Sequence, residues 1–313
     1  MKIYGPAAAA LNSLSPPQID FLQMIPKAEL HAHLNGSIPI HVLQELAAEY
    51  LASPQNASTE SGDMVKAGIE KLVAGPALDE IHDFFDLFPA IYALTATPDG
   101  LARATRGVLS VFLDGDTPQC TYLELRTTPK AMDGMDRERY LNVVLDAVEH
   151  YPADQAALII SLDRRMSNDV LEECIQIAGK LKNEGRRVVG IDLCGDPKAG
   201  DMAEFAPYFA EAHKLGLGVT LHIAETIENT PEEVLQLLTY RPQRLGHATF
   251  LNDEAFATVL ETNICIEICL SSNLLCKTVS SLESHHIRQY LERDHPIAIC
   301  VSIIESDVFY FIP

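Results

Sequence analysis

Positively charged residues are scarce in this sequence. Its 313 residues include 23 Lys and Arg against 44 Asp and Glu, which gives a formal net charge of −21 at pH 7. An acidic surface of this size repels phosphate backbones and anionic membranes. We therefore expect no nucleic acid partner, although one pocket inside an acidic protein can still be locally basic.

Long apolar runs are also missing. The longest, PIAICVSII, has nine residues, whereas a membrane-spanning helix needs roughly 18 to 20. The N-terminal MKIYGPAAAALNSL holds one Lys, and Gly5 and Pro6 precede its weakly apolar alanines, which is unlike a secretory signal. The seven cysteines are odd in number and several lie in apolar runs such as ICIEICL, so no disulfide framework is indicated. We expect a cytoplasmic protein with no membrane partner.

Eight short apolar runs alternate along the chain with segments of helical periodicity. This alternation predicts parallel βα units whose strands are covered by helices on their outer face. Eight such units make a (β/α)8 TIM barrel, so we interpret residues 1–313 as one α/β barrel domain. The segment of about residues 50–118 is predicted to be a helical cap over the catalytic mouth. The eight runs span residues 29–34, 121–128, 157–164, 188–195, 218–225, 244–249, 265–272 and 296–302.

Histidines stand where the predicted strands end, which is where barrels of this type carry their active sites. His31 and His33 are two residues apart, so a strand places both imidazoles on one face. His222 ends the fifth run, with Glu225 three residues later, and His247 ends the sixth. Several imidazoles at one end of a barrel suit Zn2+, with cobalt or iron as alternatives. A carboxylate such as Glu225 beside a metal suits general acid–base work, and His247 is placed to orient the attacking hydroxide.

Five segments together resemble the adenosine and AMP deaminase family, and most closely its adenosine deaminase-like branch, the N6-methyl-AMP deaminases. They are PKAELHAHLNGS (26–37), GIDLCGDP (190–197), LHIAE (221–225), RLGHA (244–248) and EICLSSN (267–273). The resemblance implies a barrel of the metal-dependent hydrolase type that replaces the amine at purine C6 by oxygen. It implies one Zn2+ per chain on His31, His33 and His222, proton transfer to purine N1 by Glu225, orientation of the attacking hydroxide by His247, and contact of the Gly195 backbone with purine N3.

The same resemblance points to a small purine nucleotide or nucleoside as the substrate. Adenosine deaminases proper resemble HLDGS at the first motif, whereas this chain has Asn35, and a neutral amide removes repulsion toward a 5′-phosphate. A turn after the second run offers hydroxyls and an ammonium for a monoester phosphate. We expect a monomer that converts N6-methyl-AMP or an AMP-like substrate to IMP. The predicted substrate-binding residues are His33, Asn35, His82, Thr127, Thr128, Pro129, Lys130, Asp163 and Gly195.

The end of the sequence departs from the family. The eighth strand of the family ends in an Asp-Asp pair, one for zinc and one for purine N7, but Ser302 and Ile303 stand at those places here. Glu305 and Asp307 lie too far beyond the strand to replace them, and we expect the atypical tail 301–313 to lack the last barrel helix. Weaker metal binding and lower turnover follow from this interpretation.

Three alternatives remain open from the residues alone. Besides the nucleotide deaminase described above, the chain could be an adenosine deaminase proper, a catalytically dead metal or nucleotide binder, or a different metal-dependent hydrolase of esters or amides. The last commonly uses a lysine that bridges two metals, and no suitable Lys ends the fourth run.

Overall fold

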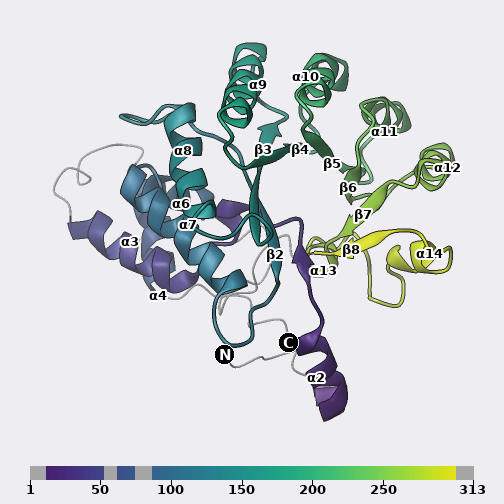
Figure 1. Ribbon diagram of the computed structural model, residues 1–313, viewed down its shortest axis with the longest axis horizontal. Coiled ribbons are helices and arrows are strands. Elements are labelled where there is room, and N and C mark those ends of the chain that lie inside the picture. The colour runs from purple at the N-terminus through teal and green to yellow at the C-terminus, as the bar shows by residue number, and fades with distance from the viewer. Residues whose placement is uncertain (1–11, 53–61, 75–86, 301–313) are drawn as a thin grey trace.

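Eight parallel strands in chain order form a single sheet that curls into a nearly closed barrel (Figure 1). The computed structural model describes residues 12–52, 62–74 and 87–300. Each strand pairs in parallel with the next, and no pairing between the first and the last is formed within these ranges. This confirms the predicted TIM barrel. The strands are β1 (Ala28–Glu29), β2 (Tyr122–Thr127), β3 (Ala156–Asp163), β4 (Val188–Cys194), β5 (Gly218–Ile223), β6 (Arg244–His247), β7 (Cys265–Ile268) and β8 (Ile297–Ile299).

The barrel interior is polar, although the strands read as apolar runs. Alternate side chains of a strand point to opposite faces, so Leu123 and Leu125 of β2 face the helices while Arg126 faces inward. The guanidinium of Arg126 reaches Glu267 of β7 at 2.8 Å and Asp192 of β4 at 3.4 Å. Since neither strand neighbours β2, these ion pairs cross the interior of the barrel. The centre of the molecule is therefore charged, and its apolar core lies between strands and helices.

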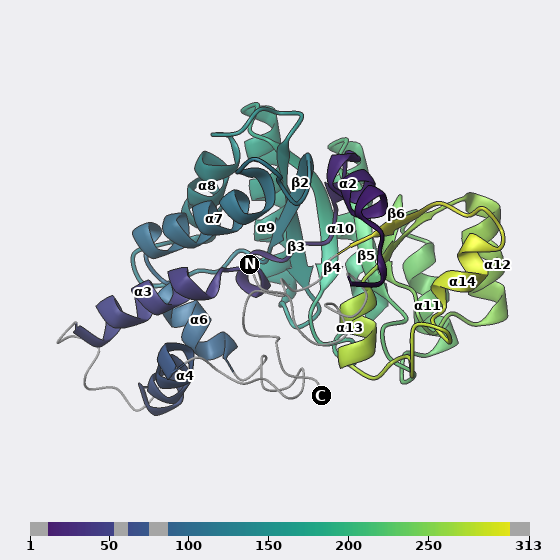
Figure 2. The ribbon, with the colours of Figure 1, turned by 90° about the horizontal axis from the view of Figure 1, so that it is seen from below.

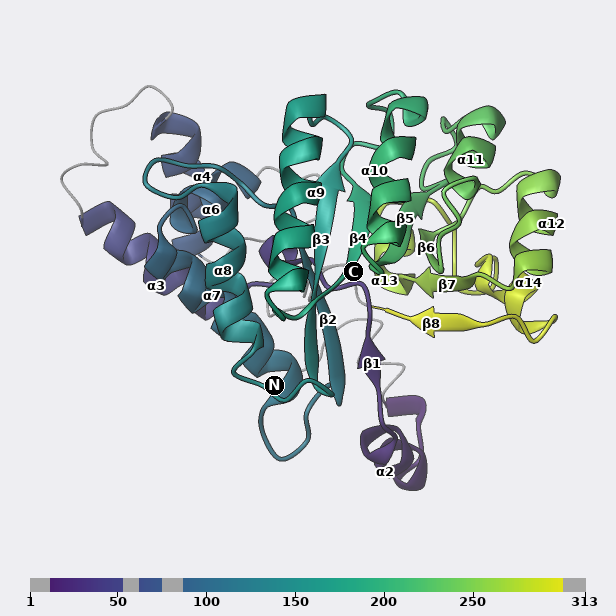
Figure 3. The same ribbon diagram turned by 45° about the horizontal axis from the view of Figure 1, so that its top comes forward.

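Helices follow the strands and cover the outer face of the barrel (Figures 1 and 3). Their starts carry the signals expected from the sequence: the Thr230 hydroxyl caps the helix that has Pro231 at its first position, and the Asn252 side chain caps the next. Such caps satisfy amide groups that have no partner inside the helix. These helices are α8 (Arg137–Val148), α9 (Asn168–Asn183), α10 (Met202–Lys214), α11 (Pro231–Leu238), α12 (Asp253–Thr262) and α14 (Ile287–Leu291). The short α13 (Leu270–Leu275) instead follows β7 directly, at the C-terminal end of the barrel.

Several strands are shorter than the apolar runs indicated, and at two of them, the first and the seventh, the structure shows what ends the strand. The first was expected over 29–34, but β1 ends at Glu29, because the Glu29 carboxylate takes the His31 amide at 2.6 Å and a 3-10 helix starts at Leu34. His33 keeps one isolated bridge to Arg126 of β2. The seventh was expected over 265–272, but the chain turns into α13 after Cys269. Both shortenings place polar residues at the mouth of the barrel.

The segment predicted as a cap is helical where it is described. It contains α4 (Gly62–Ala74), α6 (Phe88–Leu94) and α7 (Pro98–Leu113), which follow α3 (Ile40–Ala52). Figure 2 shows α4 and α6 at the same end of the molecule as α13, which follows the C-terminal end of β7, and α2 (Pro16–Met24) at the opposite end. Among the described residues, no helix is both long and apolar enough to cross a membrane. His82 and the tail 301–313 lie outside the described residues.

Candidate active site

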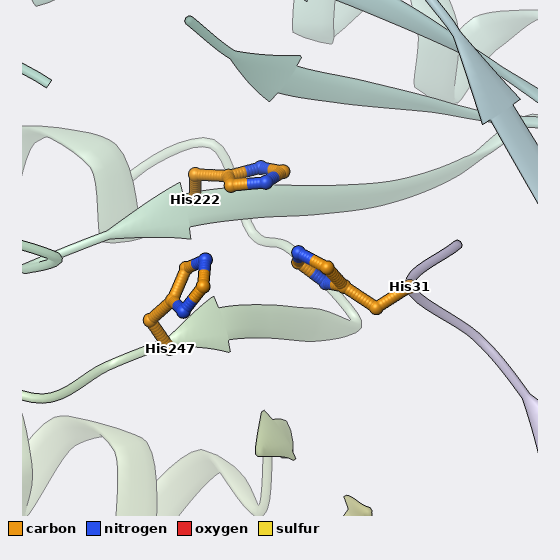
Figure 4. Close-up of side chains that lie close together, drawn as sticks. All are labelled: His31, His222 and His247. Carbon is orange, nitrogen blue, oxygen red and sulfur yellow. The ribbon is translucent and has the colours of Figure 1, made fainter. Parts of the chain in front are cut away.

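Four histidines meet where β5 and β6 end and where the chain leaves β1. The ring centroids of His31 and His222 are 4.6 Å apart, and those of His33 and His222 are 5.0 Å apart. His247 lies 5.1 Å from His31 and 5.4 Å from His222. Figure 4 shows His31, His222 and His247 converging on the space between them. The structure thus brings together four histidines that are up to 216 positions apart in the sequence, since 247 − 31 = 216.

Carboxylates behind two of these rings fix their orientation. Nδ1 of His31 contacts Oε2 of Glu267 at 2.5 Å, and Nδ1 of His222 contacts Oδ1 of Asp192 at 3.0 Å and the Leu193 carbonyl at 2.9 Å. A carboxylate or carbonyl on Nδ1 requires a proton there, which leaves the Nε2 lone pair directed into the site. This is the arrangement that metal-binding histidines commonly have.

The two carboxylates are held in turn by buried cations. Glu267 accepts from Arg126 at 2.8 Å and from Arg244 at 2.7 Å, and from the Thr220 hydroxyl at 3.1 Å. Burial alone would raise the pKa of Glu267, but the charges of Arg126 and Arg244 lower it below its ordinary value. Burial would likewise raise the pKa of Asp192, but the charges of His222 and Arg126 lower it. Both carboxylates therefore remain ionised inside the barrel.

Three of the four imidazoles are neutral at neutral pH. Burial is the main reason that the pKa values of His31 and His33 fall well below the ordinary value and that the pKa of His247 is lowered. Burial also acts to lower the pKa of His222, but the Asp192 carboxylate raises it overall. Neutral rings keep a lone pair, so His31, His33 and His247 can act as ligands or hydrogen-bond acceptors.

The residues present fit a metal ion. Nε2 of His31 is buried and has no hydrogen-bond partner among the described residues, which is costly unless something else occupies that lone pair. Nε2 of His33 and Nε2 of His222 are 3.1 Å apart, close to the roughly 3.3 Å that separates two nitrogens bound to one tetrahedral zinc. Ligand atoms within 4.8 Å of one another form two sets that share His222, one with His31 and His247 and one with His33 and Asp192. The predicted set of His31, His33 and His222 is divided between them.

Glu225 and His247 lie together beside these rings. Oε1 of Glu225 is 3.5 Å from Nε2 of His247. The backbone is left-handed at Ala224, with φ +47°, and at His247 and Ala248, with φ +65° and +49°, a region that residues other than glycine rarely adopt. These turns end both strands abruptly and direct the two side chains toward the mouth of the barrel.

The predicted phosphate turn is only partly available to a ligand. The Thr127 hydroxyl is buried and contacts the Tyr140 hydroxyl at 2.8 Å, and Pro129 is buried. Thr128 and Asn35 are half-buried, and the Lys130 ammonium lies 3.2 Å from the centroid of the Tyr92 ring. Thr128, Lys130 and Asn35 therefore remain the better candidates in this group.

Asp163 and Gly195 lie against each other at the ends of β3 and β4. A side chain at Gly195, where φ is +100°, would place its Cβ 2.6 Å from Oδ1 of Asp163. The Asp163 carboxylate also accepts from Arg165 at 2.9 Å through Nε and at 2.7 Å through the terminal nitrogen. The glycine thus leaves room for an oriented carboxylate at this edge of the site.

Several functional partners were not singled out from the sequence. Asp192, Glu267 and Arg126 all lie within the apolar runs that predicted the strands, in IDL, IEI and LRT. A charged residue in the middle of a buried strand needs a partner. The position of these charges inside apolar runs could therefore have marked them as part of the site. His82, Ser302, Ile303, Glu305 and Asp307 lie outside the described residues.

Comparison with known proteins confirms the resemblance found in the motifs. A family model described as Adenosine deaminase matches residues 26–302. The adenosine deaminase-like protein of Drosophila melanogaster is 37% identical over 299 residues, which cover 92% of this chain and 82% of that protein. The N6-methyl-AMP deaminase of Homo sapiens is 32% identical over 299 residues, which cover 91% and 80%.

A solved structure agrees with these sequence relatives. The crystal structure of arabidopsis ADAL complexed with IMP matches with a TM-score of 0.78 and 31% identity, and it covers 93% of this chain and 84% of that one. The match of fold and sequence therefore extends over nearly the whole barrel. This chain belongs to the adenosine deaminase family and is a hydrolytic deaminase.

Proposed function

We propose that this chain is a zinc-dependent deaminase of 6-aminopurine 5′-monophosphates, with N6-methyl-AMP as its preferred substrate and IMP and methylamine as products. The observation that carries the proposal is the pair of Nε2 atoms of His33 and His222 at 3.1 Å, next to the unpartnered Nε2 of His31 and to the Glu225–His247 pair. Nitrogen-rich sites of this kind favour Zn2+ over harder cations. His31, His33 and His222 would hold the ion.

The chain's own residues account for the proton transfers. When bound, Zn2+ supplies a Lewis acid that makes water a stronger nucleophile at neutral pH. His247 holds the attacking water against C6 of the purine, and Glu225 takes its proton and delivers it to N1, so that no negative charge builds up on the ring. A bond forms between oxygen and C6, the bond from C6 to the exocyclic nitrogen breaks, and the amine leaves with the second proton of the water, which leaves a C6 carbonyl and a protonated N1.

The choice of a nucleotide as the substrate rests on the names of the relatives and on the polar residues at the mouth of the barrel. Relatives named N6-methyl-AMP deaminase and a related structure with IMP bound indicate a nucleotide. Thr128, Lys130 and Asn35 would contact the phosphate, with Gly195 and Asp163 facing the purine. Although the whole chain is acidic, one ammonium and neutral donors suffice for a single phosphate. His33 and His82 complete the proposed substrate contacts.

The test compares nucleotide with nucleoside in the parent and in Lys130→Met. We expect the parent to release methylamine from N6-methyl-AMP with a higher kcat/KM than from N6-methyladenosine. The variant keeps the apolar stem over Tyr92 but loses the charge, so its KM for the nucleotide rises by about tenfold or more, while the nucleoside is unaffected. Equal use of both substrates by the parent would contradict the nucleotide assignment.

The C-terminal departure lowers turnover in this proposal. Ser302 and Ile303 stand where the resemblance implies two aspartates, and a zinc site without its carboxylate binds the ion less tightly. The double variant Ser302→Asp with Ile303→Asp is expected to bind zinc more tightly and to raise kcat. Equal metal affinity and kcat in parent and double variant would refute this role of the two positions.

The proposal also covers the cellular compartment and the oligomeric state of the chain. All seven cysteines are free thiols, which suits the reducing cytoplasm. Because every proposed site residue comes from one barrel, the chain acts as a monomer. Sedimentation of the purified chain tests the oligomeric state, and a stable dimer would contradict it.

A further inference from the structure

A side chain from a distant segment forms a hydrogen bond with the backbone of His247, whose conformation is left-handed. φ is +65° at His247 and +49° at Ala248, so the His247 carbonyl turns away from the strand that precedes it. That carbonyl accepts a hydrogen bond from Nε2 of His286 at 2.8 Å. His286 immediately precedes α14 and is 39 positions further along the chain.

His286 is itself fixed by its neighbours. Its ring stacks on that of His285, with centroids 4.4 Å apart and planes at 20°. Nε2 of His285 donates to Oδ1 of Asn273 at 3.2 Å, and Nδ1 of His285 accepts from the Ile287 amide at 3.0 Å. The Asn273 amide group donates to the Thr249 hydroxyl at 3.1 Å. The segment after β6 is thus held at Thr249 as well as at His247.

His286 is present in the form that can donate. A carbonyl partner requires the proton on Nε2, and the buried Nδ1 has no hydrogen-bond partner within the part of the chain that the structure describes. Burial, together with the neighbouring His285, lowers the pKa of His286 to about 4. The ring is therefore neutral near pH 7 and has one N–H, on Nε2, which donates to the His247 carbonyl.

We propose that His286 is a positioning residue for the deamination: its Nε2–H fixes the His247 carbonyl and, through it, the imidazole beside Glu225. The inference rests on the proposed function, in which His247 orients the attacking water. Without this bond the His247 carbonyl loses the His286 donor, and the backbone can relax toward a commoner conformation. The imidazole then moves relative to C6, and a displacement of about 1 Å costs on the order of 100-fold in rate.

The test uses two substitutions of one residue and a matched control. His286→Phe keeps a ring and removes the donor, whereas His286→Gln places an amide nitrogen where Nε2 stands. The control is His213→Phe, because Nε2 of His213 also donates to a backbone carbonyl, that of Tyr240, at 2.8 Å. His213 is half-buried like His286 but lies at the end of α10, away from the histidine cluster.

We expect His286→Phe to lower kcat for N6-methyl-AMP by about 10- to 100-fold with little change in KM. His286→Gln should recover most of the lost kcat, and His213→Phe should match the parent. The proposal is overturned if His286→Phe keeps the parent kcat, if the Gln variant is as impaired as the Phe variant, or if the control loses kcat equally.

Crystal structures of the parent and of His286→Phe separate this inference from the proposed function. If the parent turns over none of the purine substrates, the proposed function fails, and the place of the His247 ring decides the inference. A shifted ring and an altered φ at His247 in the variant support the positioning role. An unmoved His247 overturns it, whatever the activity of the parent.

Discussion

Charged side chains inside the barrel orient two of the four histidines, His31 and His222. Arg126 is fully buried and lies between Glu267 and Asp192. These two carboxylates hold Nδ1 of His31 and Nδ1 of His222. Removing one partner of such a buried set costs about 3–5 kcal/mol, because the other charge is left without compensation. The network therefore orients the rings and constrains the folded state at the same time.

Asp192→Asn tests the orienting role of one carboxylate. The amide oxygen can still accept from Nδ1 of His222, but the negative charge is lost, so we expect zinc affinity to fall about 10- to 100-fold. The measurement is competition with a chelator. The control is Ser161→Ala. The Ser161 hydroxyl donates to the other carboxylate oxygen of Asp192 at 2.9 Å, so its removal leaves the charge of Asp192 in place and should change the zinc affinity less. An unaltered zinc affinity in Asp192→Asn would rule out the orienting role.

The histidine positions were predictable from the sequence, but their partners were not. Spacing and strand ends singled out His31, His33, His222 and His247. The carboxylate partners of His222 and His31 are 30 and 236 positions away. These pairings depend on which strands the barrel brings close together, with β4 beside β5 and β7 near the end of β1. Only the closed sheet supplies that information.

At the scale of elements, the end of each strand determines which side chains enter the site. Apolar runs predicted β2 to β6 well because these strands are buried on both sides. β1 and β7 are shorter than predicted, since the Glu29 side chain takes the His31 amide and α13 starts at Leu270. Such side-chain and backbone competition is local geometry that an apolar run does not encode.

Gly195→Ala tests the turn that ends β4. The added Cβ would lie 2.6 Å from Oδ1 of Asp163 in a backbone with φ +100°. The matched control is Gly134→Ala, where φ is +75° and nothing lies within 4 Å of the added Cβ. Both variants should lose about 1–2 kcal/mol of stability, but only Gly195→Ala should raise the KM for N6-methyl-AMP. An equal KM in the two variants would show that Asp163 does not need this space.

For the whole molecule, the buried titratable groups predict the direction of the pH dependence. Burial would raise the pKa values of Asp192 and Glu267, but both lie below their ordinary 3.8 and 4.5. The charges of His222 and Arg126 lower the pKa of Asp192, and those of Arg126 and Arg244 lower the pKa of Glu267. Burial lowers the pKa of His31 below 6.5. Each of these groups binds fewer protons folded than unfolded, so the free energy of unfolding falls as the pH drops below about 6.5 and further below about 4.5.

Urea unfolding of the metal-free chain at about pH 7.5 and about pH 4 measures this dependence. His222 opposes the trend, because Asp192 raises its pKa, and its contribution to stability is present below about 6.5 and lost at higher pH. With at least three buried groups against one, we expect a lower urea midpoint at the acidic pH. An equal or higher midpoint there would contradict the ionisation states assigned to the barrel interior.

In the proposed mechanism, a metal held by histidines and proton transfer by Glu225 act together in one barrel. Glu225→Gln separates the two, because Glu225 lies beside His247 and is not among the proposed ligands. The direct measurement is zinc content and N6-methyl-AMP turnover in the parent and in this variant. We expect one zinc per chain in both, with kcat reduced by about 100-fold or more in the variant. Parent-like turnover by Glu225→Gln, or turnover by a parent free of metal, would contradict it.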